Sequence, residues 1–356
     1  MSRPEALQLQ LGWDIGGAHV KACLLQGGTL RDIAQWPCPL WQGMEHLAAA
    51  LGQARSRWSG AWEAGVAHAA TMTGEMVDLF EDRAEGVARI AGQLAEVLGP
   101  SLRLFDAGGG WRRPGEAGPG WRSIASANWQ ATARVLAARC GDGVLIDIGS
   151  TTTDLIPLRG GRVAAQGASD AERLATGELV YQGVVRTPLC ALAPRVPWGG
   201  GGVNVMNEFF ATTADVYRLT GELAASHDQA GTADGRGKDA QSTRQRLARM
   251  VGRDAADASA AEWLALARWW KEAQLREIGT QLARVAADAR LPADAPVVGA
   301  GCGAFLAADL ARRCGRPFLR YAEVALPAGG PDAALADWAD VCAPAVSVAL
   351  LACERE

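Results

Sequence analysis

The sequence lacks an excess of basic residues, a long apolar run and any export signal. Of its 356 residues, 35 are Lys or Arg and 39 are Asp or Glu, which gives a net charge of -4. Nothing here supplies the positive field that holds nucleic acid or an anionic membrane. No apolar run approaches the roughly 18 residues of a membrane span, and the first residues have no charged-then-apolar pattern. These absences favour a cytoplasmic protein that works on small molecules, with no nucleic-acid or membrane partner.

Paired cysteine motifs are also missing. The eight cysteines are scattered, with no CxxC pair and no ligand spacing to any of the four histidines. A structural zinc site and a disulfide framework are therefore disfavoured, and we expect reduced, mostly buried thiols. The share of hydrophobic residues is 49% and that of charged residues 21%, which is ordinary for a globular protein. The length predicts two domains.

What the sequence does contain is the same short pattern twice. An apolar run leads into Asp-Ile-Gly at positions 14–16 and again at 147–149, and each triplet is followed by a second apolar run. Each copy predicts a strand, a tight glycine turn and a second strand. A third strand is expected over 29–36 in the first copy and near 162–166 in the second. The two copies lie one domain length apart, which indicates an internal duplication.

The rest of the chain is expected to be largely helical. Apolar periodicity predicts helices over 44–58, 84–98, 128–139 and 304–314, and a last helix over about 332–353 that could pack back on the first domain. The Pro-Trp-Gly-Gly-Gly-Gly stretch at 197–202 predicts a flexible joint, and the polar stretch 228–240 predicts a mobile loop.

Both glycine turns are candidate phosphate sites, because backbone amides of small residues let an anion approach closely. The expected phosphate-binding residues are Gly16, Gly17, Ala18, His19, Gly149, Ser150, Thr151 and Thr152. The carboxylates at the strand ends, Asp14 and Asp147, could hold Mg²⁺ shared with the phosphate. For a single copy a plain turn is the commoner outcome, but two related copies favour function.

The two copies differ seven residues after each aspartate. The first has Lys21, a cation that could neutralise phosphate oxygens, and the second has Asp154, which could bind metal or accept a proton. We take Asp14, Lys21 and Asp154 as candidate catalytic residues. The alternatives are a solvated strand lysine and an aspartate that bonds its own turn.

A third glycine-rich element, Gly299-Ala300-Gly301-Cys302-Gly303, leads into the helix expected at 304–314. We expect a nucleotide-like loop formed by Gly299, Gly301, Cys302 and Gly303. The segment also fits the dinucleotide pattern G-x-G-x-x-A, with Glu323 about twenty residues on. Too little chain follows Glu323 for the further strand and helix units of a Rossmann domain, so that interpretation is disfavoured.

Several further residues have a functional and a plain structural interpretation. Glu75, after an expected strand at 65–70, either reaches a site or is a loop carboxylate, and Asn128 either caps its helix or contacts a ligand. Asn207, Glu208 and Asp215 are expected on a solvated helical face. For most of the tryptophans, core packing is favoured over an aromatic pocket.

Two phosphate turns and a glycine loop in this order resemble the actin, sugar-kinase and Hsp70 superfamily. The resemblance implies an α/β fold of two related actin-like (ribonuclease H-like) domains with a cleft between them. The first would comprise residues 1–140 plus about 332–356. The second would comprise 141–331, with a helical insertion at about 204–290. The segments 147–154 and 71–75 resemble the hydantoinase and oxoprolinase branch of that superfamily.

A closer resemblance is to the tetrahydromethanopterin-linked C1-transfer pathway proteins of methylotrophic bacteria and to the methanofuran-biosynthesis synthases. It is carried by five segments: Asp14 to Ala22, Ser126 to Trp129, Thr176 to Gly183, Thr212 to Arg218 and Asp234 to Lys238. The resemblance implies a transferase that joins an aminomethylfuran diphosphate to the phenol of tyramine, tyrosine or a glutamyl derivative and releases pyrophosphate. It also implies Mg²⁺ as cofactor, a diphosphate and a phenolic amine as small-molecule partners and, as an open possibility, an oligomer.

Two other hypotheses stay open. The chain could be an ATP-dependent kinase or ATPase of the same superfamily, with ATP at the glycine loop, or a non-catalytic partner protein that has kept the phosphate fold. The exact phenol, and which carboxylate holds metal and which accepts a proton, are left open by the sequence.

Overall fold

The computed structural model describes residues 9–62, 66–327 and 330–353, which fall into two compact units. The first unit comprises Met1–Gly141, Leu158–Val163 and Arg320–Glu356, and the second comprises Asp142–Pro157 and Ala164–Leu319. Residues 354–356 of the expected first domain, and Gly65 of the strand expected at 65–70, lie outside the described residues.

The first unit is built on a six-stranded sheet in the order β3-β2-β1-β4-β5-β6. Its strands are β1 (Leu9–Ile15), β2 (His19–Gln26), β3 (Thr29–Pro37), β4 (Ala67–Met72), β5 (Leu102–Asp106) and β6 (Gly110–Arg112). β1, β2 and β3 form the predicted antiparallel meander, and β4 and β5 continue the sheet in parallel from β1. β1 is buried along almost its whole length because helices cover both faces of the sheet.

The helices of the first unit are α1 (Glu45–Arg57), α2 (Arg83–Leu98), α3 (Trp121–Ile124), α4 (Asn128–Cys140), α10 (Tyr321–Ala325), α11 (Ala333–Val341) and α12 (Ala343–Cys353). Side chains of α1 and α2 pack against side chains of β1, among them Trp13. α12 packs on the sheet at β1 and β4 and against α4. A Cβ at Gly12 would lie 2.0 Å from the Ala345 carbonyl oxygen, so this strand and this helix are in backbone contact.

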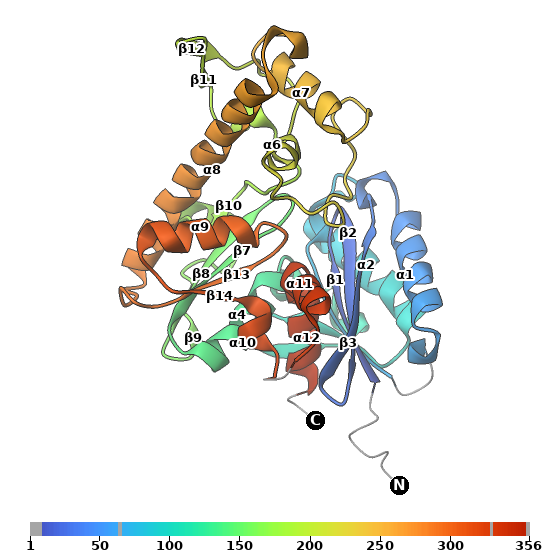
Figure 1. Cartoon of the computed structure of the whole chain (residues 1–356). Helices are drawn as coiled ribbons and strands as arrows, with labels where there is room; N and C mark the ends of the chain where they lie inside the picture. The colour runs from blue at the N-terminus through green and yellow to red at the C-terminus, as the bar shows by residue number, and fades with distance from the viewer. Residues whose placement is uncertain (1–8, 63–65, 328–329, 354–356) are drawn as a thin grey trace. The chain divides into compact units, whose positions relative to one another are not determined.

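The second unit contains the sheet β10-β8-β7-β13-β14, and β9 also pairs with β8 (Figure 1). The strands of this sheet are β7 (Gly143–Ile148), β8 (Thr153–Arg159), β9 (Arg162–Val163), β10 (Leu179–Val180), β13 (Val297–Ala300) and β14 (Phe318–Arg320). Of these, β9, the end of β8 and Arg320 are grouped with the first unit. A separate hairpin consists of β11 (Arg195–Trp198) and β12 (Gly201–Asn204). The helices of the second unit are α5 (Asp170–Thr176), α6 (Thr213–Thr220), α7 (Ala240–Arg249), α8 (Ala260–Asp288) and α9 (Ala304–Cys314).

The two sheets repeat one plan. In each, a central strand (β1 or β7) leads through a short turn into the next strand, and its other neighbour (β4 or β13) runs parallel to it. The order 3-2-1-4-5, with strand three supplied by β3 or by β9 and β10, is that of the ribonuclease H-like fold. The chain is therefore an α/β protein of two related actin-like units, and the duplication indicated by the sequence is present in the topology.

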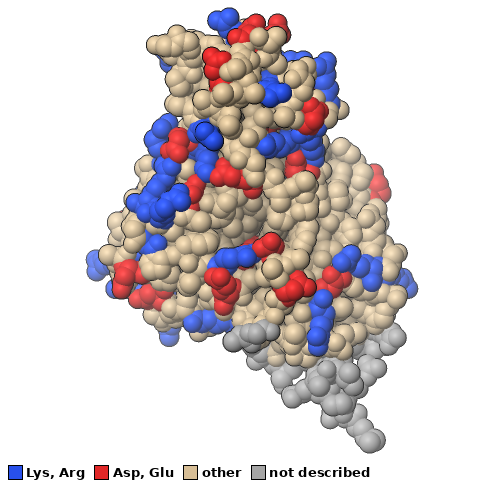
Figure 2. All heavy atoms as spheres, in the orientation of Figure 1, with Lys and Arg blue, Asp and Glu red and all other residues tan. Residues whose placement is uncertain are grey.

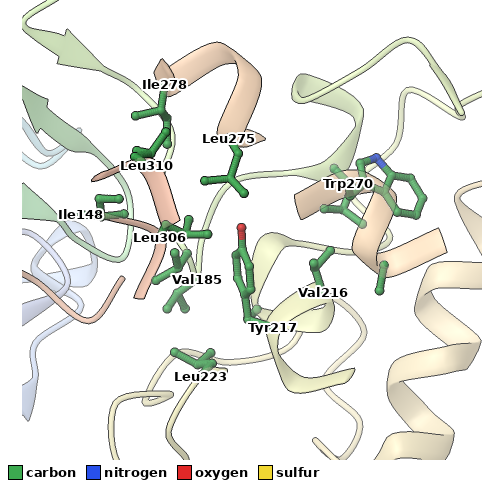
Figure 3. Packing of buried hydrophobic residues seen from close by; sticks show 14 of the residues in the cluster. Ile148, Val185, Val216, Tyr217, Leu223, Trp270, Leu275, Ile278, Leu306 and Leu310 are labelled. Atoms are coloured by element: carbon green, nitrogen blue, oxygen red, sulfur yellow. The ribbon is translucent and has the colours of Figure 1, made fainter. Parts of the chain in front are cut away.

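The core of the second unit lies between α6, α8 and α9 and the sheet. Figure 3 shows Tyr217 of α6 with its ring among Val185, Leu275 and Leu306. The Tyr217 hydroxyl donates a hydrogen bond of 2.5 Å to the Gln274 side-chain oxygen. Burial raises the pKa of this phenol well above its ordinary value, so it stays protonated. Trp263 and Trp270 are fully buried in the same cluster, which confirms core packing for these tryptophans.

One predicted helix is wrong. The helix expected over 332–353 is two helices, α11 and α12, with a 95° bend between them. Pro344 lies at the start of α12, and a proline inside a continuous helix would remove one hydrogen bond and collide with the preceding turn. In the described part of the chain no single helix is long and apolar enough to cross a membrane, and the bent pair α11–α12 meets those criteria only when the two are taken together.

Two predicted flexible segments are wrong as well. The glycine stretch at 197–202 is the turn of the β11–β12 hairpin, with Gly199 and Gly200 at φ of 59° and 82°. Such positive φ angles are those of a tight hairpin turn, which explains the glycines.

The third strand expected near 162–166 is also shorter than predicted, since β9 covers only Arg162–Val163.

The polar stretch 228–240, expected to be mobile, is held by a cluster of ion pairs. Arg246 is fully buried and contacts Asp215 at 2.8 Å and Asp234 at 3.1 Å. Arg218 contacts Asp215 at 2.9 Å and Asp228 at 2.6 Å. The network joins two of the segments that carry the closer resemblance, 212–218 and 234–238, and its sequence-distant partners explain why a local interpretation missed it.

Candidate functional site

The first glycine turn connects β1 to β2. Asp14 lies opposite Lys21 in the antiparallel register, and the Gly16 amide donates to the His19 carbonyl oxygen at 2.9 Å to close the turn. A Cβ at Gly16 would lie 2.9 Å from the same oxygen, and one at Gly17 would lie 2.7 Å from Val77 Cγ1. Glycine is therefore required at Gly16 by the backbone itself, whereas Gly17 is limited only by a neighbouring side chain.

The second turn, between β7 and β8, closes in the same way. The Gly149 amide donates to the Thr152 carbonyl oxygen, again at 2.9 Å. In both turns the amide of the first glycine thus closes the turn.

The central amides of the two turns are different. In the described part of the chain, the amides of Gly17 and Ala18, and those of Ser150 and Thr151, donate to no protein acceptor, and all four residues are partly exposed. Backbone amides that lack a partner need water or an anion. Each turn is therefore suited to hold an anionic oxygen.

The glycine loop of the second unit folds onto the end of β7. Ala300 pairs with Asp147 in parallel register, and the Gly303 amide donates to the Ile148 carbonyl oxygen at 2.8 Å. Gly301 has φ of 81°, and a Cβ there would lie 2.2 Å from that oxygen and 2.5 Å from the Asp147 carboxylate. The structure thus brings Asp147, the second turn and the nucleotide-like loop together. In the described residues after this loop, α9 leads to the edge strand β14, which is the last strand of the sheet. A Rossmann domain would need further strand and helix units here.

The carboxylates at the strand ends are nearly buried, with exposed fractions of 4% for Asp14 and 9% for Asp147. Lys21 Nζ lies 3.8 Å from Asp14 Oδ2, and the lysine side chain is 22% exposed. This contact is long for an ion pair, so the ammonium group can also serve an anion beside the turn. The first turn therefore combines free amides, a carboxylate and an accessible cation.

Asp154 is placed differently from its counterpart Lys21. Its carboxylate forms an ion pair with Arg173 of α5, which is 1% exposed, and Asp170 Oδ1 lies 3.6 Å from the same guanidinium. Burial raises the pKa of Asp154, and the Arg173 charge opposes that shift. Neither alternative considered for Asp154 foresaw this partner, because no spacing in the sequence links the strand residue to a helix residue nineteen positions on.

Five further candidates lie outside the two turns and the glycine loop. Glu75 is 1% exposed and accepts a hydrogen bond of 2.8 Å from the Ser126 hydroxyl. Asn128 is the first residue of α4 and not its cap, and its side-chain oxygen accepts from the Trp129 amide. Asp215 is fully buried, and Asn207 and Glu208 precede α6 without being helical, so the solvated helical face expected for them is wrong.

No disulfide links any of the eight cysteines, all of which lie in the described residues. Cys23, Cys38 and Cys342 are buried and the other five are not, so the expectation of mostly buried thiols is wrong. The four histidines give no metal cluster, since the described residues contain no group of three His, Cys, Asp or Glu side chains that could hold an ion. Mg²⁺ is commonly held by one or two carboxylates plus substrate phosphates. Asp14 and Asp147, each beside free turn amides, fit that kind of ion and do not fit a resident metal held by protein alone.

On the face seen in Figure 2, Lys and Arg are interspersed with Asp and Glu, so neither positive nor negative charge dominates. This face therefore carries no broad positive field. Each of the two related α/β units has a glycine turn with two central amides that could hold an anion.

Comparisons with known proteins show which family the chain belongs to. Residues 67–334 match the family model described as hydantoinase/oxoprolinase. The chain is 32% identical over 246 residues to the (4-{4-(2-(gamma-L-glutamylamino)ethyl)phenoxymethyl}furan-2-yl)methanamine synthase of Methanocaldococcus jannaschii, covering 68% of this chain and 72% of the relative. The synthase of the same name from Methanococcus vannielii is 35% identical over 124 residues, 35% of this chain and 55% of the relative. The chain belongs to the hydantoinase/oxoprolinase family and, within it, to the family of these methanofuran-biosynthesis synthases.

Solved structures are similar only at a distance. Component A of the (R)-2-hydroxyglutaryl-CoA dehydratase of Acidaminococcus fermentans has a TM-score of 0.46 at 10% identity, covering 98% of both chains. A ROK hexokinase from Thermus thermophilus has a TM-score of 0.40 at 17% identity, covering 97% of both. The strand order and directions of the two units define the fold class.

Proposed function

We propose that the protein is a transferase of methanofuran-type cofactor biosynthesis that joins an aminomethylfuran diphosphate to the phenol of tyramine, tyrosine or a glutamyl derivative. The observation that carries the proposal is the pair of matching turns, whose four central amides have no acceptor in the described chain. The relatives are named as synthases of a furan methanamine that bears a phenoxymethyl ether, which is the product of such a condensation.

The proposed reaction balances without an oxidant or a further co-reactant. The bond between the furfuryl carbon and the diphosphate oxygen breaks with both electrons on the oxygen, and the phenol oxygen forms the new bond to that carbon. The products are the ether, pyrophosphate and the phenol proton. The furan oxygen stabilises positive charge on the furfuryl carbon, so the main task of the protein is to stabilise the departing anion and to hold the phenol in line.

The residues divide this work. Each turn can bind an anionic oxygen of the substrate through its two central amides, those of Gly17 and Ala18 in one unit and of Ser150 and Thr151 in the other. Lys21 neutralises the charge that develops as the diphosphate leaves. Asp14 or Asp147 would hold Mg²⁺, which would neutralise further charge on the diphosphate when bound. A carboxylate that does not contact the ion accepts the phenol proton. Because Arg173 engages Asp154, we assign Asp154 a positioning role on β8.

A Mg²⁺-dependent phosphorus NMR assay tests the proposal. The purified protein is given aminomethylfuran diphosphate with tyramine or its glutamyl form in one reaction, and ATP with the same phenols in another. We expect pyrophosphate and a matching ether in the first reaction only. Silence in both reactions would reject the transferase and support the non-catalytic partner protein.

The second candidate function is an ATP-dependent kinase or ATPase. It is favoured by one observation, the close packing of Gly301 and Gly303 on the end of β7 beside Asp147, where a nucleotide could approach the backbone. ADP produced in the second reaction, with no ether in the first, would establish this alternative.

A further inference from the structure

One segment of the second unit lies along the phosphate turn that follows β7. The Val184 amide donates to the Gly149 carbonyl oxygen at 3.0 Å, and the Val185 and Arg186 amides donate to that of Ser150 at 3.1 and 2.8 Å. A Cβ at Gly183 would lie 2.4 Å from backbone atoms of Ser150 and Thr151. The segment therefore buttresses the turn through its backbone and leaves little freedom between the two.

Tyr181 sits at the start of this segment and is held on both sides. Val180 pairs with Thr153 in the β10–β8 ladder, and the Thr153 hydroxyl donates to the Gln182 carbonyl oxygen at 2.7 Å. The Gln182 amide donates to the Val180 carbonyl oxygen at 2.8 Å, so residues 180–182 form a three-residue turn with Tyr181 at its centre. Thr153 directly follows the phosphate turn, and continuing the ladder register places Tyr181 opposite Thr152.

The Tyr181 side chain is 60% exposed, although the preceding Leu179 and Val180 are buried. The other two tyrosines of the sequence, Tyr217 and Tyr321, are fully buried in cores. A single exposed apolar side chain is ordinary on a protein surface. What sets Tyr181 apart is that the backbone on both sides of this exposed residue is held by three contacts, next to the turn that follows β7.

We propose that Tyr181 is a substrate-recognition residue whose ring packs against the aromatic ring carried by the diphosphate substrate. This inference rests on the proposed function and adds the residue that selects for a ring beside the diphosphate. Stacked aromatic rings gain affinity beyond the area they bury, and a planar phenol side chain does so with little loss of side-chain freedom. The turn amides recognise the charge of the ligand, and Tyr181 distinguishes a furfuryl diphosphate from pyrophosphate alone.

The test compares two probes, aminomethylfuran diphosphate and inorganic pyrophosphate, by calorimetric titration of the full chain with Mg²⁺. We expect Tyr181→Ala and Tyr181→Leu to weaken binding of the furan diphosphate about tenfold, and Tyr181→Phe to retain it. Binding of pyrophosphate should be unchanged in all three variants. Leu174→Ala, a truncation of another exposed apolar side chain of the same unit (51% exposed), is the matched control and should change neither affinity.

Each outcome decides something different. Equal affinity of wild type and Tyr181→Ala for the furan diphosphate would overturn the inference while leaving the transferase in place. An equal loss for both probes would also overturn it, because it would mean that the substitution disturbs the turn. If the wild-type protein shows no preference for the furan diphosphate over pyrophosphate and forms no ether, the proposed function fails as well.

Discussion

The two glycine turns are closed by equivalent backbone hydrogen bonds, and they differ in the side-chain contacts of the strands beside them. In the first unit, Trp13 of β1 donates its indole N–H to Nδ1 of His68 at 3.2 Å, a neutral contact, and the cation Lys21 stays partly accessible at the turn. In the second unit, the position that corresponds to Lys21 is Asp154, and its charge is taken up by buried Arg173. The duplicated fold therefore keeps the same turn in both units, while the side chain seven residues after the aspartate is a partly exposed lysine in one unit and a mostly buried, paired aspartate in the other.

This difference predicts different effects of charge changes on the stability of the two units. A buried ion pair loses much of its Coulomb energy to desolvation, but removing one partner leaves an unpaired buried charge. The second unit is therefore sensitive to loss of a single charge, and the first to protonation of a neutral histidine. The experiments below test that contrast, from the largest expected effect to the smallest.

The largest effect is expected for Asp154→Asn, which removes the nearer of the two carboxylates beside the Arg173 guanidinium. We expect the free energy of unfolding to fall by about 3 kcal/mol, measured by urea denaturation. Asp170→Asn removes a more distant carboxylate, at 3.6 Å from the same guanidinium, and should cost clearly less. Asp154→Leu combined with Arg173→Met should recover most of the stability. An unchanged midpoint for Asp154→Asn would show that the pair is not structural.

Lys21→Met should do the reverse, with a large effect on turnover and little on stability. Loss of a charge that stabilises the departing diphosphate is expected to lower kcat by about 100-fold, measured as pyrophosphate release. Unfolding should stay within about 0.5 kcal/mol of wild type because a partly exposed pair contributes little. Lys21→Arg, which keeps the charge, is the control. Near-normal turnover in Lys21→Met would make Lys21 a solvated strand residue.

The backbone of the second turn can be disturbed without touching a charge. In Gly183→Ala the new Cβ would meet backbone atoms of Ser150 and Thr151 at 2.4 Å, so the turn has to move. We expect a loss of about 2 kcal/mol in stability together with weaker pyrophosphate binding. Gly231→Ala, whose Cβ would have no neighbour within 4 Å, is the matched control. Normal pyrophosphate affinity in Gly183→Ala would separate this segment from the anion site.

The smallest effect is a pH dependence in the first unit. Burial lowers the pKa of His68 from 6.5 to about 4. Below pH 6.5 the unfolded chain binds a proton that the folded chain does not, so stability is lost as the pH falls. Between pH 7.5 and 5.5, the shifted pKa of His68 lowers the free energy of unfolding by about 1.4 kcal/mol. Thermal melts of wild type and His68→Gln at the two pH values measure it, and an equal slope in both would contradict the assignment.

Local signals were enough to predict much of the fold. The Asp-Ile-Gly turns, the third strand expected over 29–36 and the helices at 44–58 and 304–314 all depend on glycine placement or on side-chain periodicity, which neighbouring residues determine. Two of the errors have another cause. The stretch 228–240 is ordered by Arg218 and Arg246 from flanking helices, and Asp154 is paired with an arginine of α5. Such contacts between sequence-distant residues leave no periodic trace.

The backbone contact between β1 and α12 affects the order in which the chain can fold during synthesis. β1 is synthesised long before the helix that covers one face of its sheet, residues 343–353. Until then Gly12 and the side chain of Gln10, which donates to the Ala349 carbonyl oxygen at 2.9 Å, face no partner helix. We expect the second unit to acquire its fold first on the ribosome, although its sequence lies in the interior of the chain.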